Sequence, residues 1–122
     1  MKNLLLASLL FFAVEASSQS LNSIVSNHVF VMCDEYGTPS DAYGQYFYMV
    51  FHSNGTMNLL CGSTLDKAVD NGAKKTGTWS SSGGSVTWKW IDSGEGGTAS
   101  RNGYSENLLG SGGSIFKNLG GF

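Results

Sequence analysis

The chain has 122 residues, including 17 Gly and one Pro, with 13% charged and 12% aromatic side chains. Disordered chains carry few aromatic residues, so this composition argues against disorder driven by excess charge. The formal net charge is −2 and the Lys and Arg residues are not clustered, which argues against nucleic-acid binding because phosphate contacts need clustered cations. One domain is expected at this length.

The first segment is typical of a secretory leader. Lys2 gives a basic start, residues 4–14 are all apolar or small, and a small-residue cleavage pattern ends at Ala16. We therefore expect residues 1–16 to be a cleaved signal peptide, residues 17–122 to be a single β domain, and the protein to be secreted, extracellular or periplasmic. The apolar run is about half of the ~20 residues that a membrane-crossing helix needs, so no membrane span is expected.

Two cysteines, Cys33 and Cys61, follow the leader. In an exported chain they favour a disulfide, which would stabilise the fold by about 3–4 kcal/mol through loop entropy. The alternative is two unpaired buried thiols. There is no C-x-x-C pair, and the only histidines are His28 and His52. The sequence therefore predicts a Cys33–Cys61 disulfide and no metal or cofactor.

Two segments, residues 21–25 and 64–69, are suited to single helical turns. Elsewhere, β-branched and aromatic runs alternate with Gly, Ser and Asn, which is typical of short strands joined by tight turns. The fold class predicted is all-β, a small antiparallel β-barrel or β-sandwich of about six to eight short strands. Strands are expected at 28–33, 45–52, 56–61, 76–81, 85–91, 104–109 and 114–119.

Asn54-Gly55 lies between two apolar runs, which is a strong signal for a two-residue hairpin turn. That turn predicts a register with His52 opposite Met57 and Tyr48 opposite Cys61. Both faces of the hairpin are apolar, so another layer, a ligand or another chain must cover the second face. The aromatic and sulfur-containing residues of one face are Phe47, Met49 and Phe51.

Gly83-Gly84 predicts a second tight hairpin. Its register places Trp79 opposite Trp88 and Gly77 opposite Trp90, with polar residues on the other face. These indole rings form the core, or alternatively some of them line a pocket.

The cysteines also constrain the order of the strands. If strand 28–33 paired directly with strand 45–52, Cys33 and Cys61 would flank the middle strand at about 9.6 Å, two strand spacings. A disulfide needs Cα atoms within about 7 Å. We therefore expect the first strand to cross to another layer, or to bend over the sheet at Cys33.

Catalytic motifs are absent from the sequence. There is no G-x-S-x-G elbow, the carboxylates are scattered without a pairing pattern, and neither cysteine has the context of a nucleophile. His28 and His52 are expected to be unrelated residues at strand ends. The sequence therefore predicts a protein that is not an enzyme, and a small secreted hydrolase is the least favoured of three hypotheses.

Three segments, Phe51-His-Ser-Asn-Gly-Thr56, Thr76-Gly-Thr-Trp-Ser80 and Ser85-Val-Thr-Trp-Lys-Trp90, together resemble a pattern of small exported lipocalin-like (calycin-type) β-barrels. The resemblance covers about residues 45–109. It implies an antiparallel barrel whose interior accepts an apolar ligand, with Trp79, Trp88 and Trp90 in the interior.

The favoured hypothesis is a secreted, non-catalytic, lipocalin-like binding module for a small apolar ligand or a partner protein. The alternative is an extracellular structural or assembly subunit, a surface or filament component, that uses exposed strand edges and the apolar hairpin face and so forms a homo-oligomer. The residues expected to bind the ligand are Trp79, Trp88, Trp90, Phe47, Met49 and Phe51.

Overall fold

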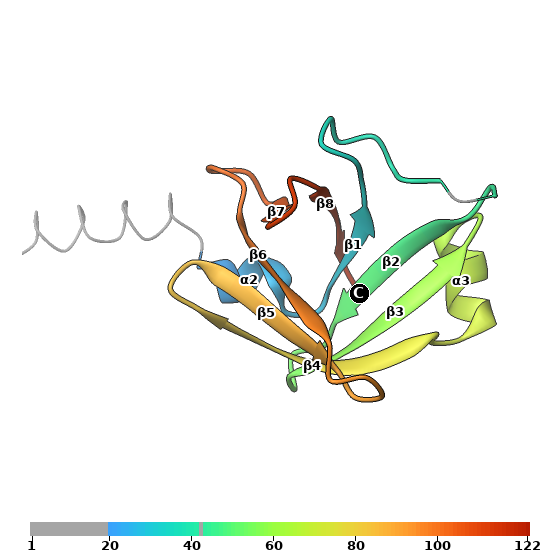
Figure 1. Cartoon of the computed structure of the whole chain (residues 1–122), viewed down its shortest axis with the longest axis horizontal. Coiled ribbons are helices and arrows are strands. Elements are labelled where there is room, and N and C mark those ends of the chain that lie inside the picture. The colour runs from blue at the N-terminus through green and yellow to red at the C-terminus, as the bar shows by residue number, and fades with distance from the viewer. Residues whose placement is uncertain (1–19, 42) are drawn as a thin grey trace, which may run out of the picture.

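The computed structural model describes residues 20–41 and 43–122, which form a closed antiparallel barrel of eight strands (Figure 1). Each strand pairs with the next one along the chain, and the last pairs with the first. The predicted all-β barrel is confirmed, whereas the predicted signal peptide lies outside the described residues. The strands are β1 (His28–Met32), β2 (Tyr46–Phe51), β3 (Thr56–Gly62), β4 (Lys75–Ser82), β5 (Ser85–Trp90), β6 (Gly96–Arg101), β7 (Leu108–Gly110) and β8 (Ile115–Gly121).

The two helical turns expected from the sequence are α2 (Leu21–Val25) and α3 (Leu65–Asn71). Each begins after a hydroxyl residue whose side chain accepts a hydrogen bond from the first turn of the helix. Ile24 and Val25 of α2 are fully buried in the same hydrophobic cluster as the inward-facing strand residues. The α2 helix therefore closes one end of the barrel. In the part of the chain that the structure describes, no helix has the length and apolar character needed to cross a membrane.

Aromatic rings fill the inside of the barrel. The Phe51 ring lies 5.6 Å from the ring of Phe30, 5.6 Å from Trp79 and 6.3 Å from Trp88, measured between centroids, and Trp88 lies 5.7 Å from Phe116. All four pairs meet edge to face, the arrangement that the ring quadrupoles favour. A barrel of eight strands is just wide enough for side chains to fill, and here they do so.

Glycines lie opposite several of these rings. The register predicted for the Gly83-Gly84 hairpin is confirmed, with Trp79 opposite Trp88 and Gly77 opposite Trp90. On the next strand, Gly97 pairs with Trp88, and a Cβ atom at Gly97 would lie 2.6 Å from Cζ2 of that indole. The volume of the Trp88 ring therefore requires a residue without a side chain at position 97.

The same requirement explains a strand that the sequence patterns do not reveal. The sequence predicted no strand at β6 (Gly96–Arg101). It predicted a strand at residues 104–109, where the structure has only the short β7 (Leu108–Gly110). The inward positions of β6 are Gly97 and the buried Ala99, both small because Trp88 and its neighbours occupy the space. With Thr98 as its one β-branched residue and no aromatic residue, β6 gives only a weak strand signal.

The register predicted for the first hairpin is wrong by one residue. The loop has three residues rather than two, because His52 N–H donates to Thr56 O at 2.9 Å and Gly55 takes a φ of 88°. This is the geometry of a turn followed by a left-handed Gly, a common three-residue hairpin. Met57 therefore pairs with Phe51 instead of His52, and Cys61 pairs with Phe47 instead of Tyr48.

The predicted disulfide is also wrong, since Cys33 and Cys61 are both free and buried. β1 does not cross to another layer: it pairs directly with β2 in the register Val31 opposite Tyr48. β1 and β3 thus flank β2 at a separation of about 9.6 Å, two strand spacings, and Cys33, directly after β1, forms an isolated bridge with Pro39. Cys33 also belongs to the outer apolar cluster, whereas Cys61 follows the inward alternation of Met57.

Replacing Gly97 by Ala tests the filling of the barrel. The new methyl group would meet the Trp88 indole, so we expect a loss of about 1–3 kcal/mol in the free energy of unfolding, measured with urea. Gly112→Ala is the matched control, because no atom lies within 4 Å of a Cβ at that position. Its change should stay within about 0.5 kcal/mol. Equal stabilities of the two variants would contradict a filled interior.

Thiol labelling tests the state of the cysteines. Unfolded in urea without a reductant, the chain should take up two alkyl groups from iodoacetamide, counted by mass spectrometry, because both thiols are free. Cys33→Ser should take up one. Labelling that appears only after reduction would show that a disulfide joins Cys33 and Cys61.

Candidate ligand-binding groove

The barrel has a second hydrophobic cluster on the outer face of β1–β3. Its residues are Val29, Val31, Cys33, Tyr48, Val50, Leu60 and Ala68, with Tyr46, Leu65 and Ile115 packed at its edge. It includes the apolar face of the Asn54-Gly55 hairpin, which we expected another layer, a ligand or another chain to cover. Figure 1 shows α3 beside β3 on the outside of the barrel. The cover is therefore supplied, in part, by the chain itself.

α3 lies directly against the strand it covers. Ala68 is fully buried, and a Cβ atom on Gly62 would lie 2.5 Å from the Ala68 nitrogen. Thr64 Oγ1 accepts from Lys67 N–H at 3.2 Å, and Asn71 Nδ2 donates to Cys61 O at 3.1 Å. The helix is thus fixed at its start, middle and end.

With only seven residues, α3 covers part of the apolar face and leaves a groove beside it. The groove has a volume of about 380 Å³. Val29, Val50 and Leu60 form its buried floor, and Val69 and Phe122, 58% and 63% exposed, form two apolar walls. The complete lining is Val29, Val50, His52, Asn58, Leu60, Leu65, Asp66, Val69 and Phe122.

A hydrogen-bonded pair supplies the polar side of the groove. His52 Nε2 lies 2.8 Å from Asn58 Oδ1, and Asn58 Nδ2 donates to Thr76 Oγ1 at 3.2 Å. Because Asn58 Oδ1 can only accept, His52 Nε2–H is the donor of this bond. The Phe122 ring meets the His52 ring edge to face at 5.4 Å.

The residues predicted to bind a ligand lie elsewhere, in or next to the filled interior. Trp79, Trp88, Met49 and Phe51 are buried there, Trp90 packs against them, and Phe47 is half-buried near the end of the barrel at which β2 begins. None of the six lines the groove beside α3, and their binding role stays a prediction. Trp79 Nε1 donates to His52 O at 2.8 Å, so one of them helps to position the groove.

Sequence patterns indicated an apolar face on β2 and β3 but missed the groove residues His52, Val69 and Phe122. The two-sided apolar hairpin was the available signal. It could not reveal how much of that face a short helix would leave open, because that depends on where α3 ends and on how the C-terminal segment packs.

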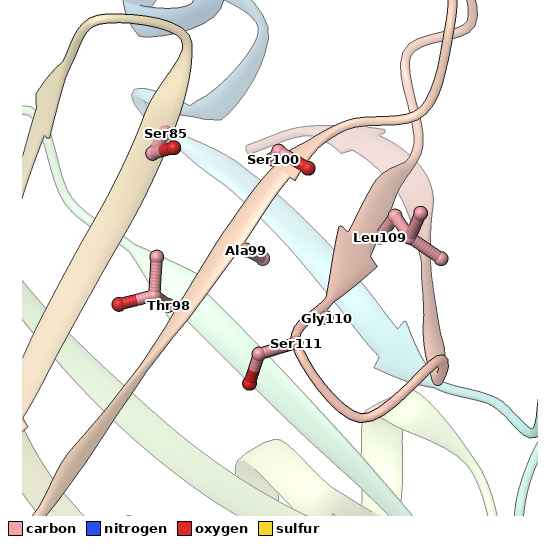
Figure 2. Close-up of a pocket in the computed structure, with 7 residues that line it drawn as sticks. All are labelled: Ser85, Thr98, Ala99, Ser100, Leu109, Gly110 and Ser111. Atoms are coloured by element: carbon pink, nitrogen blue, oxygen red, sulfur yellow. The ribbon is translucent and has the colours of Figure 1, made fainter.

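A second cavity of about 150 Å³ lies where β7 has only three residues (Figure 2). Its lining is mostly small and hydroxylated: Ser85, Thr98, Ala99, Ser100, Leu109, Gly110 and Ser111. Small-molecule sites commonly measure about 300–1,000 Å³, so this cavity is small and the groove beside α3 is the better candidate.

The described residues contain no group of three or more His, Cys, Asp or Glu placed to hold a metal ion. His28 Nδ1 pairs with Asn118 Oδ1 at 3.0 Å, while His52 pairs with Asn58, so the two histidines have separate partners. Comparisons with protein-family models, with curated proteins and with solved structures find no match to this chain.

Two titratable groups of the outer cluster give a pH prediction. Burial raises the pKa of the Cys33 thiol above its ordinary 9.0, and burial also raises the pKa of the Tyr48 hydroxyl above 10.0. Both groups ionise first in the unfolded chain, so their contribution to stability is complete below about pH 8 and is lost as the pH rises through the pKa values of the folded state. The urea midpoint should therefore fall between about pH 8.5 and about pH 10.5.

Tyr48→Phe should make this decline shallower, because it removes one of the two groups. Tyr36→Phe is the control, since Tyr36 is 84% exposed. A decline of equal steepness in Tyr48→Phe and the wild-type protein would contradict the assignment.

Proposed function

We propose that this chain is a secreted, non-catalytic, lipocalin-like binding protein that holds a small apolar molecule in the groove beside α3. The proposal is supported mainly by one observation: a concave surface with a buried aliphatic floor and two exposed apolar walls. Its volume of about 380 Å³ falls within the range of small-molecule sites, about 300–1,000 Å³.

The closed, sequentially paired eight-stranded barrel is the architecture that the lipocalin-like resemblance implies. The location of the proposed site differs from that resemblance. Phe51, Trp79 and Trp88 pack on one another inside the barrel, so the apolar surface open to a ligand is on the outside. We therefore place the ligand between α3 and the β1–β3 face.

A small molecule is favoured over assembly through strand edges. Closure of a barrel removes free edges, and each described strand pairs with two neighbours. The groove is also a local depression beside a seven-residue helix, whereas a stable protein interface buries about 800 Å² on each partner.

Binding can be measured with N-phenyl-1-naphthylamine, an apolar dye that fluoresces in apolar sites. Val69→Gln should weaken binding about fivefold, because it removes part of an apolar wall worth about 1 kcal/mol of contact. Ile91→Gln is the matched control: Ile91 is 69% exposed and lies outside the groove lining. The control should bind the dye as the wild-type protein does.

Equal affinities of the Val69→Gln and Ile91→Gln variants would show that the dye binds elsewhere and would overturn the groove as the site. No dye binding, together with a dimer in size-exclusion chromatography with light scattering that Val69→Gln dissociates, would show instead that a second copy covers this face.

A further inference from the structure

We infer that the groove selects amphipathic cations, namely molecules with an apolar body and a protonated amine. This inference rests on the proposed function and adds the chemical class of the ligand. Its starting point is the distribution of charge around the groove. Asp66 is the one charged side chain among the lining residues, and the remaining lining is aliphatic or aromatic apart from His52 and Asn58.

The surrounding sequence leaves this carboxylate without a cation from the floor. β1, β2 and β3 contain no charged residue, and residues 20–66 contain no Lys or Arg. Lys67 follows Asp66 directly on α3, and adjacent helical residues do not face one another. Asp70 lies one helical turn further on, on the side of Asp66, and it is also three residues from Lys67.

Hydrogen bonding points to the same ligand chemistry. Asn58 bonds to His52 and to Thr76, so the Asp66 carboxylate is the charged acceptor that the lining offers to a ligand. An ammonium group supplies donors and a complementary charge. An alcohol supplies one donor without charge, whereas a carboxylate supplies no donor and is repelled by Asp66. The expected order of affinity is amine, then alcohol, then carboxylate.

Three ligands with the same eight-carbon body test this order: octylamine, 1-octanol and octanoate, each displacing N-phenyl-1-naphthylamine at neutral pH and low salt. The wild-type protein should bind octylamine about threefold to fivefold more tightly than 1-octanol, the size of effect expected for a partly exposed charge pair. Raising the salt to about 1 M, where screening acts within ~3 Å, should reduce this ratio.

Asp66→Asn should bring the amine-to-alcohol affinity ratio close to one, whereas the control Asp92→Asn, an exposed acid outside the groove lining, should retain the wild-type ratio. Val69→Lys provides a second variant, because position 69 is 58% exposed and accepts a long polar side chain. It should shift the preference towards octanoate.

The two proposals fail in different ways. If none of the three ligands displaces the dye, the groove is not a small-molecule site and the proposed function fails. If all three displace it with equal affinity, or if Asp66→Asn keeps the preference for octylamine, the groove binds apolar ligands but the selection of cations is wrong.

Discussion

The structure depends on filling a barrel of eight short strands with large rings and placing small residues opposite them. Trp88 lies against Gly97, and Trp90 lies opposite Gly77, where any Cβ would collide with a neighbouring strand or ring. The rings then contact one another edge to face through Phe51. The packed side chains stabilise the barrel and fill its interior. The apolar surface available to another molecule therefore lies on the outer face of the barrel.

That outer face follows from the composition of three adjacent strands. β1, β2 and β3 are apolar on both sides, so they contribute to the interior and also to the cluster around Val50 and Leu60. A helix of seven residues is too short to cover the whole cluster. The close approach of Gly62 to Ala68 sets the position of the helix, and the uncovered remainder becomes the groove.

Local sequence patterns predicted most of the strands and one hairpin register, but they failed at the first hairpin, at β6 and at the cysteines. The Gly83-Gly84 turn fixed the Trp79–Trp88 pairing correctly, because a two-residue turn leaves one register. The Asn54-Gly55 signal led to the wrong register because one more residue joined the loop, a difference of backbone geometry that composition does not show. β6 gave only a weak strand signal, because its inward residues are small and leave space for the Trp88 ring on the neighbouring strand. A Cys33–Cys61 disulfide and a direct meander of the first three strands exclude each other, and the structure has the meander.

Different elements of the fold fix the floor, the helical wall and the polar side of the groove, and this rigidity favours ligand binding. Its floor belongs to β1, β2 and β3, and β2 pairs with β1 over four residues and with β3 over six, so the buried aliphatic side chains are rigidly placed. Its helical wall is fixed separately, through the Thr64 cap and the Asn71 bond to Cys61 O. Its polar side is held by Trp79, whose indole N–H binds the His52 carbonyl from within the barrel. A site whose parts are all fixed before binding loses little conformational entropy when a ligand enters, so even a shallow apolar groove can gain useful affinity.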